Sequence, residues 1–151
     1  MVKVHTVEMI EHSAHSTPDV KAHADLPNGA LVGLTYTGAS KVTKAPATGD
    51  EIYIVLNTQE GDEEYDLAYT IKQDSFVNLF KLSNWVGKEL DVTFENVTGD
   101  TTAISVGNTL TFDATTFKFK KGTATSGDIA FEVMAITPIG VRVLVKIAGN
   151  V

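Results

Sequence analysis

Histidine is the residue type here that is best suited to metal chemistry, and two of the four histidines, His12 and His15, stand three residues apart. Glu8, Glu11 and His23 lie nearby in the sequence, and zinc accepts imidazole together with carboxylate, so a site is conceivable. There is, however, no second ligand cluster on a rigid element, and histidines in a polar segment are more often simply solvated. We therefore predict no metal site and no other cofactor.

Carboxylates form two further groups that could do chemistry. Glu89, Asp91 and Glu95 share one face of a predicted strand and could resemble the paired acids of a glycosidase. Carboxylates opposite an apolar face are, however, what the outside of a sheet carries. The acidic segment Glu60–Asp66 has its glycine, Gly61, too early for the calcium loop of an EF-hand. No nucleophile motif, phosphate-binding loop or dinucleotide fingerprint is present, so we predict that the chain is not an enzyme.

Three aromatic residues, Trp85, Tyr53 and Tyr36, could form a platform on which a sugar stacks. A lone tryptophan beside a turn more often closes a core. A carbohydrate-binding β-sandwich module, for instance in a phage fibre or a similar adhesive assembly, is therefore our alternative interpretation. It requires Trp85 to be exposed beside the other aromatic rings.

Composition narrows the class of protein. The 151 residues, 43% of them hydrophobic, suit one domain with a substantial core. The absence of cysteine excludes disulfides and cysteine nucleophiles and fits a reducing cytosol. A net charge of −7 with one arginine, Arg142, argues against nucleic acid as a partner. No apolar run approaches the roughly 20 residues that span a membrane, and no signal segment is recognisable at the N-terminus.

The pattern along the chain predicts an all-β fold, a single compact antiparallel β-sandwich or barrel with an extended N-terminal arm. Short alternating segments separated by glycine-containing turns are typical of that class. Residues 77–82 fit a short helix as well as a strand, and residues 37–50 are expected to form a surface loop. Gly107 and Asn108 are expected to close a hairpin between 103–106 and 109–112. The clearest predicted strands are 30–36, 51–56, 90–94, 129–136 and 141–147.

The two C-terminal strands are predicted to form a hairpin whose register follows from a three-residue loop, Pro138–Gly140. Phe131 then faces Ile147, and Val133 faces Val145. One face of the hairpin is wholly apolar in this arrangement, because strand side chains alternate between faces. We expect that face to belong to the core.

Residues 1–25 are predicted to form the arm and residues 26–151 the β domain. Ordering a polar arm costs about 1–2 kcal/mol of backbone entropy per residue, so contacts must hold it. The chain's own sheet could supply some of them. We expect a partner to supply the rest by strand addition, with apolar side chains filling its pockets. The predicted contact residues are Val2, Val4, Val7 and Ile10.

Several short motifs follow one another in an order that resembles a known family. They are Leu26–Val32, Pro46 after a Lys/Ala-rich segment, Glu51–Val55, Tyr65 in its acidic segment, Val77–Leu82 and Gly87–Thr93. This order is similar to that of head-associated structural proteins of tailed bacteriophages, the capsid decoration (cement) proteins. The valine-rich closing strand is similar as well. Lys81 stands where the family pattern often has arginine.

The resemblance implies a non-enzymatic protein that binds the outer surface of the phage head. It would stabilise the shell by bridging capsid subunits, with the major capsid protein as its partner. A homo-oligomer, for which we expect three copies, would be made in the host cytoplasm and would end on the virion surface. Neither nucleic acid nor membrane is an expected partner. The resemblance also favours a strand over a helix for residues 77–82.

Overall fold

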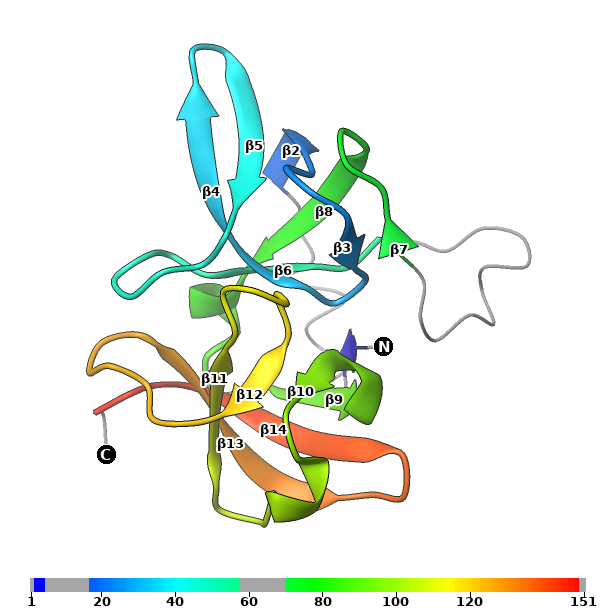
Figure 1. The fold of residues 1–151 in the computed structure, drawn as a ribbon. Coiled ribbons are helices and arrows are strands. Elements are labelled where there is room, and N and C mark those ends of the chain that lie inside the picture. The colour runs from blue at the N-terminus through cyan, green and yellow to red at the C-terminus, as the bar shows by residue number, and fades with distance from the viewer. Residues whose placement is uncertain (1, 5–16, 58–69, 150–151) are drawn as a thin grey trace.

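The computed structural model describes residues 2–4, 17–57 and 70–149, and its strands form two main assemblies (Figure 1). A seven-stranded sheet has the strand order β1-β9-β14-β13-β11-β12-β10. A closed five-stranded barrel has the order β2-β5-β4-β6-β8, and β3 pairs with β7 in a small third sheet. The predicted all-β class is therefore confirmed.

The sheet consists of β1 (Val2–Val4), β9 (Glu89–Thr93), β10 (Val97–Thr98), β11 (Thr109–Phe112), β12 (Phe119–Lys121), β13 (Ile129–Ile136) and β14 (Gly140–Ile147). The barrel consists of β2 (Thr17–Lys21), β4 (Leu31–Thr37), β5 (Ser40–Lys44), β6 (Tyr53–Val55) and β8 (Phe76–Lys81). The small sheet contains β3 (Leu26–Pro27) and β7 (Thr70–Ile71). Three 3₁₀ turns, η2 (Leu82–Trp85), η3 (Phe94–Asn96) and η4 (Thr101–Ala103), complete the described elements. Among the described helices, none is long and apolar enough to span a membrane.

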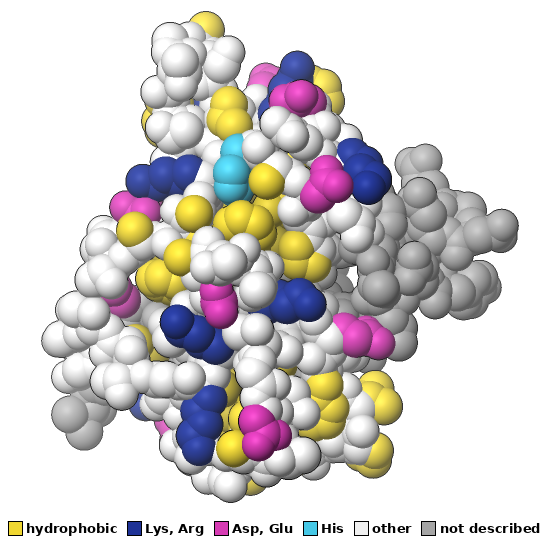
Figure 2. All heavy atoms as spheres, in the orientation of Figure 1, with side chains coloured by type: hydrophobic (Ala, Val, Ile, Leu, Met, Phe, Trp, Pro, Cys, Tyr) yellow, Lys and Arg dark blue, Asp and Glu magenta, His cyan; other side chains and the backbone are white. Residues whose placement is uncertain are grey.

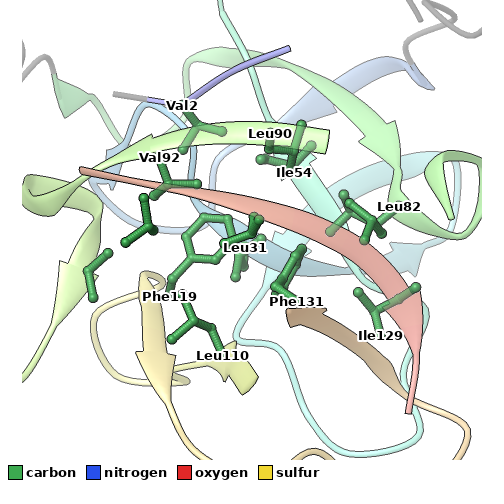
Figure 3. Packing of buried hydrophobic residues seen from close by; sticks show 14 of the residues in the cluster. Val2, Leu31, Ile54, Leu82, Leu90, Val92, Leu110, Phe119, Ile129 and Phe131 are labelled. Atoms are coloured by element: carbon green, nitrogen blue, oxygen red, sulfur yellow. The ribbon is translucent and has the colours of Figure 1, made fainter. Parts of the chain in front are cut away.

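Strands β4 and β6 belong to the barrel but serve two cores. Successive side chains of a strand point to opposite faces, and here both faces are covered. Leu31 and Ile54 pack into the sheet core, while Val32 and Val55 pack into the barrel core. Figure 3 shows Leu31 among the side chains of the sheet core, beside Phe119 and Phe131 in this view. This double burial explains why the segment around β6 is apolar at every position.

The C-terminal hairpin has the predicted apolar face, but the predicted register is wrong. Phe131 pairs with Val145, and Val133 pairs with Val143, so each predicted partner is two residues away from the real one. A shift of two residues leaves every side chain on its face. All four residues of these pairs are accordingly buried.

The turn and a bulge each contribute one residue to the register error. Ile136 pairs with Val141, so the loop contains four residues, 137–140, and the predicted three-residue loop is wrong. The pairing shifts between Val133 and Ala135, so β13 carries one more residue than β14 over this stretch. Alternation of residue types cannot reveal such an extra residue in advance. In this register Glu132 and Lys146 are diagonal neighbours, and their side chains form an ion pair of 3.1 Å.

The segment predicted as an arm contains two strands of the described structure. β1 lies at one edge of the sheet and pairs with β9. Thr17–Lys21, within the same segment, forms β2, which pairs with both β5 and β8 and closes the barrel. Val20 of that strand is fully buried.

Three other local predictions are decided by the structure. The expected surface loop at 37–50 is wrong in part, because Ser40–Lys44 forms β5 after a turn at Gly38, whose φ is +62°. The expected strand at 103–106 is also wrong, because η4 occupies its start. Residues 77–82 are mostly strand, as the resemblance implied.

Candidate binding surfaces

The turn between β13 and β14 is a rigid element fixed by hydrogen bonds from both sides. The Thr137 backbone N–H donates to the Gly140 carbonyl at 2.9 Å, and the Gly140 N–H donates to the Thr137 hydroxyl at 3.0 Å. The Phe94 N–H of η3 donates to the Ile139 carbonyl at 3.0 Å. With its backbone held in this way, the Ile139 side chain projects into solvent and is 70% exposed.

Large apolar side chains are exposed around this turn. Met134 stands at the β13 bulge, and Ile136 ends the strand. The loop before β11 places Val106 at the same end of the sheet, because the N–H of the next residue, Gly107, donates to the Val133 carbonyl at 2.8 Å. We call these four residues the hairpin-end patch: Val106, Met134, Ile136 and Ile139, which are between 42% and 70% exposed. Figure 2 shows hydrophobic side chains gathered over the turn at the lower right.

A groove of about 400 Å³ runs beside the patch, between the end of β9 and the start of β14. Gly140 allows β14 to lie close to β9 along the floor of the groove, because a Cβ at this position would overlap the backbone of Val92 and Thr93. At one end, the Arg142 Nε donates to the Asp91 Oδ1 at 3.0 Å. The groove therefore combines apolar walls with one half-buried ion pair.

The carboxylates that the sequence placed on one strand face do not converge as a pair of catalytic acids. Asp91 is bound to Arg142, and Glu95 lies beyond the strand in η3. Glu89 also has an interaction partner. The acidic segment at 60–66 lies outside the described residues.

A second hollow, of about 200 Å³, lies on the barrel beside β4 and β6. Its lining combines two aromatic rings with charged groups: Leu34, Tyr36, Lys44, Asp50, Glu51 and Tyr53. We call it the barrel hollow. It brings together two of the three residues of the predicted aromatic platform, Tyr36 and Tyr53.

Trp85, the third member of that platform, is buried and does not reach the surface. It is 2% exposed and packs against Phe80, with ring centroids 5.5 Å apart. The alternative interpretation required an exposed Trp85, and this requirement is not met. The tryptophan instead closes the sheet core.

His23 is the one histidine that the described residues include. Its Nδ1 lies 2.7 Å from the Thr43 hydroxyl, and its ring makes a T-shaped contact with Phe117, with centroids 5.2 Å apart. Burial lowers the pKa of His23 below its ordinary value. Within residues 2–4, 17–57 and 70–149, no three His, Asp or Glu side chains are grouped as metal ligands. His12 and His15 lie outside those ranges.

The predicted partner-contact residues have different positions. Val2 is 6% exposed and belongs to the core of its own sheet, so its side chain is not available to a partner. Val4 pairs with Leu90 through β1. Val7 and Ile10 lie outside the described residues.

No protein-family model, curated protein or solved structure matches this chain. The surfaces must therefore be interpreted from their own chemistry. Our sequence analysis missed the hairpin-end patch, although a signal was available. Ile136 and Ile139 flank a proline within a turn, where an isoleucine side chain has little chance of burial.

Proposed function

We propose that this protein is a non-enzymatic capsid decoration protein that binds the outside of an assembled phage head and reinforces it by bridging capsid subunits. The observation that carries the proposal is the hairpin-end patch. Exposed apolar clusters on an otherwise polar protein mark sites of protein–protein contact. The resemblance in the motifs supplies the class of partner, the major capsid protein.

The form of the patch supports a protein partner. Three of its four side chains, Met134, Ile136 and Ile139, are held on a hydrogen-bonded turn and a bulged strand, so little conformational entropy is lost when a partner covers them. The adjoining groove could accept a protruding side chain of the shell. The Asp91–Arg142 pair at its end is a polar rim of the kind that surrounds apolar contacts in interfaces.

Bridging requires at least two contacts with the shell. The edge strand β1 offers the second, because the end of a sheet presents backbone groups to which another strand can add. Self-association into an oligomer would multiply the patches on one particle in the same way. Either arrangement gains from avidity, since the second contact forms at a high effective concentration.

Co-sedimentation tests the proposal, with heads of the phage whose genome encodes the chain and with its free capsid subunits. We expect the protein to sediment with assembled heads and not to bind free subunits. A double variant, Ile136→Ser with Ile139→Ser, should lose at least about tenfold in affinity, because interface anchor residues each contribute more than about 1 kcal/mol.

Phe76→Ser is the matched control, because Phe76 is 63% exposed but lies on the barrel. The control should bind heads as the wild type does, and both variants should melt as cooperatively as the wild type. If the double variant binds heads as tightly as the wild type, the hairpin-end patch is not part of the interface. Failure of the wild-type protein to bind any head would overturn the function itself.

A further inference from the structure

We propose that the barrel hollow binds a neutral saccharide, in a subsite of the size of a single pyranose ring. This site is independent of the hairpin-end patch. It differs from the platform predicted from sequence because Trp85 takes no part in it. The inference rests on the arrangement of Tyr36, Tyr53 and the charged groups around them.

The register of the barrel brings the two tyrosines to one face. Tyr53 of β6 pairs with Val32 of β4. Leu34 and Tyr36 follow Val32 at intervals of two, so they share its face of the strand. The described pairing of β4 with β6 ends at Tyr53, and β4 continues beyond it. The barrel face thereby opens, and Tyr36 becomes 66% exposed.

The rings provide the apolar half of a sugar site. A tyrosine presents a flat apolar body and a polar hydroxyl, which suits the C–H face and the hydroxyls of a pyranose. Tyr53 is only partly exposed and packs against the barrel core, so its ring is fixed from behind. Burial, with smaller contributions from Tyr36 and Glu51, raises the pKa of Tyr53. Its hydroxyl therefore remains a hydrogen-bond donor at neutral pH.

Charged groups of both signs form the other half of the site. Lys44 Nζ lies 3.1 Å from Asp50 Oδ2, and the Ala47 N–H donates to the same oxygen at 3.2 Å. The lysine side chain lies across Gly33, where a Cβ would come within 2.9 Å of it. The exposed Glu51 follows Asp50 along the same wall. These groups offer donors and acceptors for sugar hydroxyls.

The charged lining favours a neutral ligand over an anion. Lys44 is paired with Asp50, so the exposed Glu51 leaves the hollow with a net negative charge that repels anions. The wall is also built before a ligand arrives, because the Gly49 N–H donates to both oxygens of Asp128, at 3.0 and 3.3 Å. Asp128 is 8% exposed and belongs to the loop before β13, so the sheet holds the 45–50 segment in place. Pre-organisation of this kind lowers the cost of binding.

Titration of the ¹⁵N-labelled full chain, followed by NMR, tests the proposal. The probes are glucose, galactose, mannose and N-acetylglucosamine, and tetramethylammonium serves as a cationic comparison. At least one sugar should shift the amide signals of residues around Tyr36, Glu51 and Tyr53. Tyr36→Ala and Glu51→Gln should each weaken that sugar's affinity about tenfold, equivalent to about 1.4 kcal/mol.

Phe76→Ala is the control, because Phe76 is an equally exposed aromatic residue elsewhere on the barrel. Its affinity for the sugar should equal that of the wild type. The proposal is overturned if none of the sugars shifts these signals, or if tetramethylammonium alone does so. It is also overturned if Phe76→Ala weakens binding as much as Tyr36→Ala, since the sugars would then adsorb to any exposed ring. None of these outcomes depends on attachment to phage heads.

Discussion

The seven-stranded sheet and the five-stranded barrel bury their side chains by different means. The barrel closes on itself and so leaves no strand edge, whereas the sheet ends at β1 and at β10. The sheet core contains the large aromatic residues Trp85, Phe119 and Phe131. The fully enclosed residues of the barrel core are smaller and aliphatic. The barrel thus combines a closed ring of backbone-paired strands with a core of small side chains, whereas the open sheet has a core of large ones.

The two surfaces follow the same division. The hairpin-end patch lies on the sheet, whose large core can stabilise an exposed apolar end. The barrel hollow lies where β4 extends beyond its pairing with β6. Because β4 and β6 contribute side chains to both cores, we expect the sheet and the barrel to unfold together in one transition.

The largest effect should come from the sheet core. Phe131→Ala removes a side chain that is 1% exposed and stacks edge-on against Phe119 at 4.7 Å. The free energy of unfolding should fall by about 3–5 kcal/mol, which lowers the melting temperature by roughly 6–20 °C for a chain of this length. Thermal and urea unfolding measure it. An unchanged melting temperature would contradict the assigned core.

Leu79→Ala makes the corresponding test in the barrel. Leu79 is fully buried and lies where β8 pairs with both β6 and β2. We expect a loss of about 2–5 kcal/mol, in one transition seen alike by circular dichroism and by the fluorescence of the buried Trp85. Two separate transitions would show that the barrel unfolds independently of the sheet.

Gly140→Ala probes the close approach of β14 to β9. A Cβ at this position would overlap backbone atoms that cannot rotate away, so we expect a loss of about 1–3 kcal/mol. Gly49→Ala is the comparison, because its φ is +84° but no atom lies near the added methyl group. Urea unfolding should show the smaller loss for Gly49→Ala. Equal losses would mean that the packing of β14 on β9 is looser than described.

The smallest effect on stability should come from His23, which contacts Thr43 of the barrel strand β5. Burial lowers the pKa of His23 in the folded state, while the unfolded value is about 6.5. Its contribution to stability is complete above about pH 6.5 and is lost as the pH falls through that value towards the lowered pKa. Urea unfolding from about pH 7 to 5 should show a shallower fall in stability for His23→Gln than for the wild type. Parallel curves would contradict the assignment.

The acidic groups titrate in a separate window. Hydrogen bonds from the Gln73 N–H and from Lys72 lower the pKa of Asp25, and bonds from Thr102 lower that of Asp100. The stability that such carboxylates contribute is present above about pH 4 and is lost only as the pH falls below it. They therefore do not obscure the range in which His23 acts.

The sequence by itself determined which residues face a core in the regular strands. Alternation of residue types placed Phe131, Val133, Val143 and Val145 on one face, and all of them are buried. The strand predicted at 51–56 contains a continuous apolar run around Ile54, and it is buried on both faces. Burial of a strand face is local chemistry repeated at every second residue, so it is visible in the order of the letters.

Only the tertiary structure decided where polar segments become strands and which side chains meet. Thr17–Lys21 has no periodicity and includes Asp19 at a φ of +60°, yet backbone bonds to β5 and β8 hold it in the barrel. The four-residue turn and the bulge near Met134 together set the hairpin register. Packing removed Trp85 from the surface and brought Tyr36 and Tyr53 into one hollow. Hydrogen bonds between backbone groups do not depend on the type of side chain. The partners that supply them, and the surfaces that result, are therefore fixed by neighbours distant in the sequence.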